Sequence, residues 1–107
     1  MRVKQSKVFG KLQSESDMMG TQFVRLELKV AVSLIDIASH SFSPERRKQL
    51  LKDARRSYDT VLQVLPLLSV TGRDREEITG KLCEVRGRLE QFGISVPISV
   101  WELRDTG

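Results

Sequence analysis

The sequence is short of the residues that most often cross-link or ligate in small proteins. Its 107 residues include a single cysteine, Cys83, which excludes an internal disulfide bond and favours a reducing compartment. They also include a single histidine, His40, with no second metal-ligand residue type at a ligating distance along the chain. We therefore expect His40 to be a capping residue at a helix C-terminus, where the helix dipole favours a cation, and we predict no metal or other cofactor.

Long hydrophobic runs are also missing. The first residues, MRVKQSKVFGKLQSES, lack the apolar core of a secretory signal, and charged residues such as Arg25 and Asp36 interrupt the longest apolar segment. No glycine-rich phosphate loop, paired metal-ligand motif or nucleophile elbow occurs. These absences predict a cytoplasmic protein that neither spans a membrane nor acts as an enzyme.

What the chain does contain is an ordinary globular composition with a small excess of positive charge. Hydrophobic residues make up 39% and charged residues 30%, and the formal net charge is +4. A chain of this length favours one domain with one core. A charge of this size favours solubility more than it indicates a nucleic-acid partner.

The segment VRLELKVAVSLIDIAS, residues 24–39, fits either a strand or a helix. As a strand it would place Leu26, Leu28 and Val30 on one face. However, the neighbouring segments offer no partner strand except a C-terminal stretch that Pro97 interrupts, and the run is too long for a typical strand. We therefore predict a helix over about residues 21–39.

Two further helices have clearer boundary signals. Residues 44–66 start with Ser43 as the N-cap and Pro44 in the first helical position, and they carry one apolar stripe. Residues 72–93 carry apolar residues in alternating steps of four and three and end at Gly93. The predicted fold is all-α, an antiparallel three-helix bundle at about 21–39, 44–66 and 72–93.

The two ends of the chain are predicted to be appendages of a bundle domain at residues 21–93. Residues 1–20 are polar and basic, which indicates an N-terminal tail or a short, weakly held helix. Residues 94–107 alternate apolar and small residues around Pro97, which indicates an extended tail with Trp101 as an anchor.

The predicted first helix has more apolar surface than a three-helix bundle requires. On a helical wheel its polar residues gather in a narrow arc, whereas a bundle helix needs an apolar stripe of only about 100°. Either the tails or another chain must cover the surplus. We predict self-association, with a dimer as the simplest form, at an interface that includes Phe23, Leu28, Val32 and Ile35.

Glu27 lies among the apolar residues of this helix. A buried carboxylate is costly unless it is paired or hydrogen-bonded. Glu27 either accepts a hydrogen bond from Tyr58 or an interface arginine, which would bury both polar groups, or it lies at the solvent-exposed rim. We prefer the second reading.

The third helix is predicted to have a second, small-residue face. Gly80, Cys83 and Gly87 lie opposite Ile78, and a glycine inside a helix costs about 1 kcal/mol, so their presence needs a reason. Close approach of another helix would supply that reason, and we add these residues to the predicted interface. The alternatives are an exposed face that tolerates glycine, or a reactive thiol at Cys83.

The densest basic run, ERRKQLLKDARR, gives the second helix a basic face of Lys48, Lys52, Arg55 and Arg56. Such a face can hold phosphates, so a nucleic-acid-associated accessory protein is the alternative function. Interleaved acidic residues and the lack of a stacking aromatic residue argue against nucleic acid as the partner.

The segment ARRSYDTVLQVLP resembles the second helix of a tetratricopeptide unit, because Ala54, Tyr58, Val61 and Pro66 stand at that motif's spacing. The segment DREEITGKLCEVRGRLEQFG resembles the closing helix of such units and the third helix of microtubule-interacting-and-transport-type bundles. The three-helix order is similar to that of small uncharacterised bacterial helical proteins. The first helix departs from the tetratricopeptide pattern, and only one unit is present.

This resemblance implies a helical-hairpin architecture and, by analogy, a noncatalytic protein-interaction or scaffold role. It carries over no ligand-contacting residue. The sequence alone identifies neither the partner nor the pathway.

Overall fold

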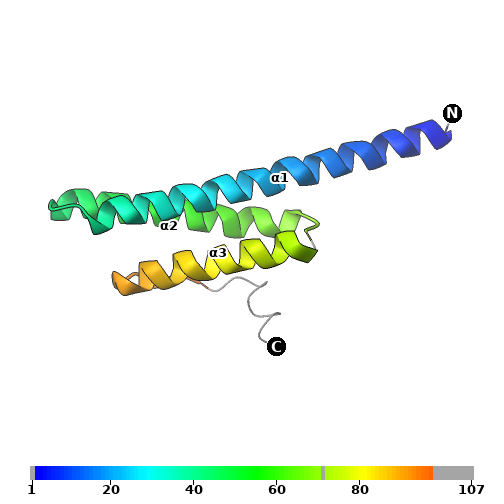
Figure 1. The fold of residues 1–107 in the computed structure, drawn as a ribbon. Helices are drawn as coiled ribbons and strands as arrows, with labels where there is room; N and C mark the ends of the chain where they lie inside the picture. The colour runs from blue at the N-terminus through cyan, green and yellow to red at the C-terminus, as the bar shows by residue number, and fades with distance from the viewer. Residues whose placement is uncertain (1, 71, 98–107) are drawn as a thin grey trace.

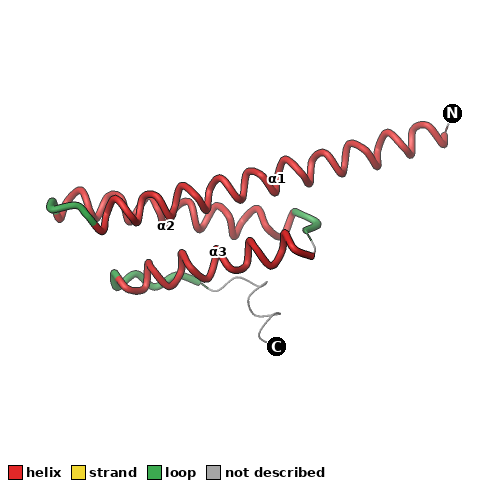
Figure 2. The backbone as a smooth tube through the Cα atoms, in the orientation of Figure 1, coloured by secondary structure: helices red, strands yellow, loops and turns green. Residues whose placement is uncertain are grey.

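Over residues 2–70 and 72–97, which the computed structural model describes, the chain forms three α-helices and a short 3-10 turn. They are α1 (Arg2–Ser39), α2 (Pro44–Val64), η1 (Leu65–Leu67) and α3 (Gly72–Gln91), and side chains are described from residue 18 onward. The helices run alternately in opposite directions, so α1 and α3 are parallel (Figure 1). Helix and loop account for all of the described backbone (Figure 2), which confirms the all-α class.

The first helix is longer than predicted. It is continuous from Arg2, so residues 2–20 are part of α1 and not a separate tail or short helix. Its N-terminal half extends past the ends of α2 and α3 (Figure 1). No proline interrupts residues 2–20, and a helix propagates where it meets no stop signal. The low apolar content of residues 1–20 gave little indication that the helix begins so early.

The predicted start of α2 is confirmed at atomic detail. The Ser43 hydroxyl accepts a hydrogen bond from the Arg46 backbone N–H at 3.2 Å, and Pro44 occupies the first helical position. At the other end the helix stops at Val64, and Pro66 lies in η1. Proline is tolerated there because a backbone N–H in the first turn of a 3-10 segment has no carbonyl partner within the segment, so its absence in proline costs little.

Gly93 terminates α3 in the way its residue type predicts. Its φ is +81°, in the left-handed region that glycine adopts without strain. The Gly93 N–H donates to the Glu90 carbonyl, and the Ile94 N–H donates to the Leu89 carbonyl at 3.0 Å. This pair of bonds is the Schellman motif, and it turns the chain back toward the bundle.

The first residues of the C-terminal segment pack on the bundle. Val96 is buried, and the fully buried Tyr58 donates its hydroxyl to the Pro97 carbonyl at 2.8 Å. Residues 94–97 therefore cover part of the core, whereas the predicted anchor, Trp101, lies outside the described residues.

One hydrophobic core joins the elements. α1 packs more extensively against α2 than against α3. The inner face of α1 consists of Val24, Leu28, Ala31, Ile35 and Ala38. The rest of the buried core consists of Leu51, Ala54, Tyr58, Val61, Leu65, Val70, Ile78, Leu82, Val85, Leu89 and Val96.

Candidate functional site

The most prominent surface feature is an apolar stripe of exposed side chains along α1. We call it the outer face, and it consists of Met19, Phe23, Leu26, Val30 and Ile37, which are between 38% and 69% exposed. On a helical wheel its centre lies about 130° from the centre of the inner face. Large apolar side chains that gather in one stripe, instead of being scattered singly, mark a contact surface.

The spacing within the outer face is that of a coiled-coil seam. Its residues are separated by steps of four, three and four, and Ser33 occupies the next position before Ile37. Steps that average 3.5 residues keep a helix in contact with a partner helix along its length. In the sequence, the same spacing continued toward the N-terminus reaches Leu12 and Phe9.

The structure divides the predicted α1 interface residues among different environments. Phe23 belongs to the outer face, but Leu28 and Ile35 are 2% and 0% exposed and belong to the inner face. Their assignment to an intermolecular interface was wrong, because the helical wheel gives angles and not the side on which α2 and α3 pack. Val32 is half-buried and faces α3.

The alternative in which Glu27 accepts a hydrogen bond from Tyr58 is not what the structure shows. The Tyr58 hydroxyl donates to the Pro97 carbonyl, and Glu27 is half-buried on the flank of α1. Glu27 therefore lies at the rim, the reading we preferred. A flank position lets the carboxylate reach water, so it avoids the cost of complete burial.

The small-residue face of α3 is open. Gly80 and Cys83 are exposed and Gly87 is half-buried, and a methyl group added at either glycine would meet nothing within 4 Å. No other helix of this chain therefore packs closely there within the described residues. Its use as an interface between chains stays a prediction.

The basic face of α2 points into solvent. Lys48, Lys52, Arg55 and Arg56 are all exposed. Asp59 lies among them, with a carboxylate oxygen 3.8 Å from Nε of Arg55. The face can therefore contact an anionic partner, but an acidic group on the same helix offsets part of its charge.

A groove between α1 and α3 was not anticipated. It has a volume of about 340 Å³ and is lined by Arg25, Leu28, Lys29, Val32, Glu77, Ile78 and Lys81. Three ion pairs bridge the helices: Arg25 donates to Asp74 and, at 3.2 Å, to Glu77, and Arg88 donates to Asp36. The hydrogen bond to Asp74 raises the pKa of the Arg25 guanidinium above its ordinary value.

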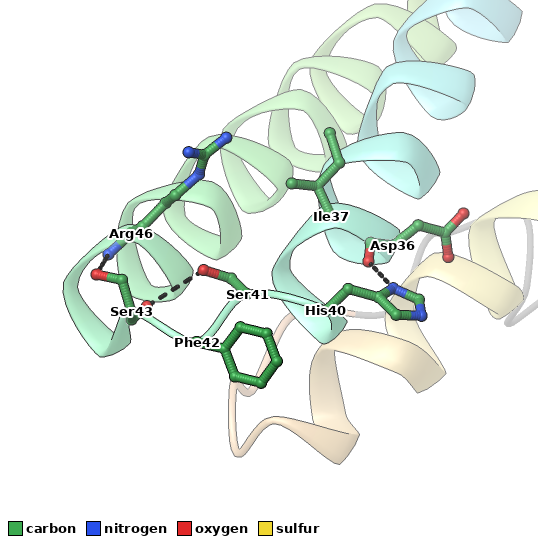
Figure 3. Close-up of a pocket in the computed structure, with 7 residues that line it drawn as sticks. All are labelled: Asp36, Ile37, His40, Ser41, Phe42, Ser43 and Arg46. Atoms are coloured by element: carbon green, nitrogen blue, oxygen red, sulfur yellow. Dashed lines mark hydrogen bonds between the residues drawn. The ribbon is translucent and has the colours of Figure 1, made fainter.

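The hairpin tip between α1 and α2 forms a second, more open hollow of about 590 Å³ (Figure 3). It is lined by Asp36, Ile37, His40, Ser41, Phe42, Ser43 and Arg46. His40 Nδ1 lies 2.8 Å from the Asp36 carbonyl oxygen, and because a carbonyl only accepts, the imidazole N–H is the donor. This confirms the predicted position of His40 at the end of the first helix. Phe42 at the tip is completely exposed.

No group of three or more His, Cys, Asp or Glu residues that could hold a metal occurs in the described part of the chain. Among the same residues, no helix combines the length and apolar character needed to cross a bilayer.

Comparisons with protein-family models, with curated proteins and with solved structures found no match to this chain. The likeness of residues 54–66 to a tetratricopeptide helix therefore stays a resemblance in sequence.

Proposed function

We propose that this protein is a noncatalytic protein-interaction or scaffold module that forms a dimer through the outer face of α1. The single observation that carries the proposal is the outward stripe of Met19, Phe23, Leu26, Val30 and Ile37. The resemblance to tetratricopeptide helices supports a protein-binding role by analogy alone.

Dimer formation would bury apolar surface of the outer face that now contacts water. Each outer-face side chain now holds a large part of its apolar surface in solvent, and burial of apolar surface is the main favourable term in protein association. The stripe also includes Phe23 and Met19, and aromatic residues and methionine are enriched at interfaces.

The geometric argument concerns length and periodicity. A helix of 38 residues is about 57 Å long, and its N-terminal half extends beyond the bundle (Figure 1). An isolated helical stretch that contacts nothing is marginal in water, because most helical stability in proteins comes from packing. A second copy of α1 on the outer face would supply that packing along the seam.

Analytical ultracentrifugation of the full chain at tens of micromolar tests the proposal. We expect a dimer for the natural sequence and a monomer for the double variant Leu26→Glu/Val30→Glu, because both carboxylates would be buried in the seam. Circular dichroism should show that the variant remains helical, since neither residue contributes to the core.

The matched control is Gln63→Glu/Gln91→Glu, which adds the same charge at exposed positions of α2 and α3. This control should remain a dimer. A natural sequence that sediments as a monomer, or a dimer that survives Leu26→Glu/Val30→Glu, would refute the proposal.

A second candidate function is association with nucleic acid through the basic face of α2, favoured by the exposure of all four of its cations. Binding to a short DNA or RNA duplex should then fall steeply with salt and be lost in Lys52→Glu/Arg56→Glu. No retention on heparin at low ionic strength would eliminate this candidate.

A further inference from the structure

The parallel helices α1 and α3 are held in register by three ion pairs. Arg25 pairs with Asp74, which lies 49 residues further along the chain, and also with Glu77, while Asp36 pairs with Arg88; in these last two cases the partner lies 52 residues further along the chain. Adding the same offset to Lys29, which lies between these pairs on α1, gives Lys81 on α3. Two like charges, Lys29 and Lys81, therefore lie between the flanking ion pairs.

Neither lysine has a partner across the groove. Lys81 Nζ lies 3.2 Å from Glu84 on its own helix. Lys29 makes no hydrogen bond or ion pair with any residue of the described part of the chain. Two ammonium groups that face each other repel, whereas the ion pairs on either side of them attract. An anion bound between the two lysines would attract both ammonium groups and so offset their mutual repulsion.

Apolar side chains lie beneath the lysines. Leu28 and Ile78 are buried at the bottom of the groove, and Val32 is half-buried beside them. The volume of about 340 Å³ is near the lower end of the range for small-molecule sites, about 300–1,000 Å³. A ligand that suits both parts of the groove has one anionic end and one aliphatic end.

We propose that the groove between α1 and α3 binds an aliphatic monocarboxylate, with the carboxylate between Lys29 and Lys81 and the chain against Leu28, Val32 and Ile78. The two ammonium groups supply charge-assisted hydrogen bonds. The remaining polar lining, Arg25 and Glu77, is already paired and does not compete for the carboxylate. The groove lies on a different side of α1 from the outer face, so this proposal does not depend on dimer formation.

Titration of isotope-labelled protein with acetate, butanoate, hexanoate and octanoate, followed by two-dimensional NMR, tests this site. Octanoate should cause saturable shifts at the groove residues. Binding should tighten by roughly three- to fourfold for each methylene that leaves water. Octan-1-ol and octylammonium should bind more weakly than octanoate, because neither provides an anion. Equal responses to acetate and octanoate, or equal binding of octanol and octanoate, would overturn the proposal.

Charge variants identify the site. Lys29→Gln/Lys81→Gln should weaken octanoate binding at least tenfold, whereas the matched variant Lys48→Gln/Lys52→Gln on α2 should bind normally. Lys29→Glu should also abolish binding, because it creates an opposite-charge pair with Lys81, and it should raise the unfolding temperature without ligand.

The outer face is a competing apolar surface, and one variant separates it from the groove. Leu26→Glu/Val30→Glu should keep its octanoate affinity even if it no longer forms a dimer. Loss of octanoate binding in this variant, together with normal binding in Lys29→Gln/Lys81→Gln, would place the ligand on the outer face and refute the groove proposal.

Discussion

Ile35 and Ile37 stand two residues apart on the same helix and are chemically identical, yet their environments are opposite. Ile35 is 0% exposed in the core, and Ile37 is 46% exposed on the outer face. A step of two residues turns an α-helix by about 200°, which carries the side chain from one side of α1 to the other. Hydropathy therefore does not decide which of the two is buried; the position of α2 and α3 does.

The two faces also differ in side-chain size. The inner face includes Ala31 and Ala38, both 0% exposed, which allow α2 to approach closely. The outer face has no alanine and presents Phe23 and Met19 instead. Small residues suit close packing against a fixed neighbour, and large, adaptable residues suit a surface that meets a separate partner.

The sharpest test of this comparison is the same substitution on both faces. Ile35→Ala should lower the free energy of unfolding by about 2–5 kcal/mol, because it removes buried methyl groups and leaves a cavity. Ile37→Ala should cost less than about 1 kcal/mol in the monomer. Urea denaturation at low protein concentration measures both, and equal losses would show that the two faces are not distinct.

A smaller effect is expected at Tyr58, whose ring belongs to the core beside the inner face. Tyr58→Phe keeps the ring and removes the hydrogen bond to the Pro97 carbonyl, so the loss of unfolding free energy should be about 1 kcal/mol. Hydrogen exchange of the residue 94–97 amides should increase in parallel. An unchanged stability would mean that the C-terminal segment does not support the core.

The smallest changes in the free energy of unfolding are expected for glycine substitutions, which extend the comparison to the small-residue face of α3. Gly80→Ala should raise the free energy of unfolding by up to about 1 kcal/mol, because the position is helical and open. The control is Gly93→Ala, which should lower it by about 1 kcal/mol, since its φ is +81°. If Gly80→Ala instead dissociates the dimer in ultracentrifugation, the small-residue face of α3 belongs to the interface.

Local signals predicted much of the fold. Ser43 and Pro44 marked the start of α2, and Gly93 marked the end of α3, because capping depends on residues that are adjacent in sequence. The start of α1 at Arg2 was missed, because residues 1–20 have too few apolar positions to show helical periodicity.

The candidate sites were less predictable. Phe23 was assigned to a surface correctly, whereas Leu28 and Ile35 were assigned to the same surface and lie in the core. The groove and its facing lysines went unnoticed, because Lys29 and Lys81 become neighbours only through the register of α1 against α3.

By itself, the amino-acid sequence determined that the chain forms helices, where α2 begins and α3 ends, and that the first helix has more apolar surface than a three-helix bundle needs. These properties depend on residues within a few turns of one another. Only the tertiary structure decided which side of α1 is buried, and only the ion pairs to α3 placed Lys29 opposite Lys81. Both outcomes depend on contacts between different helices, and those between α1 and α3 join residues some fifty positions apart, which no local periodicity encodes.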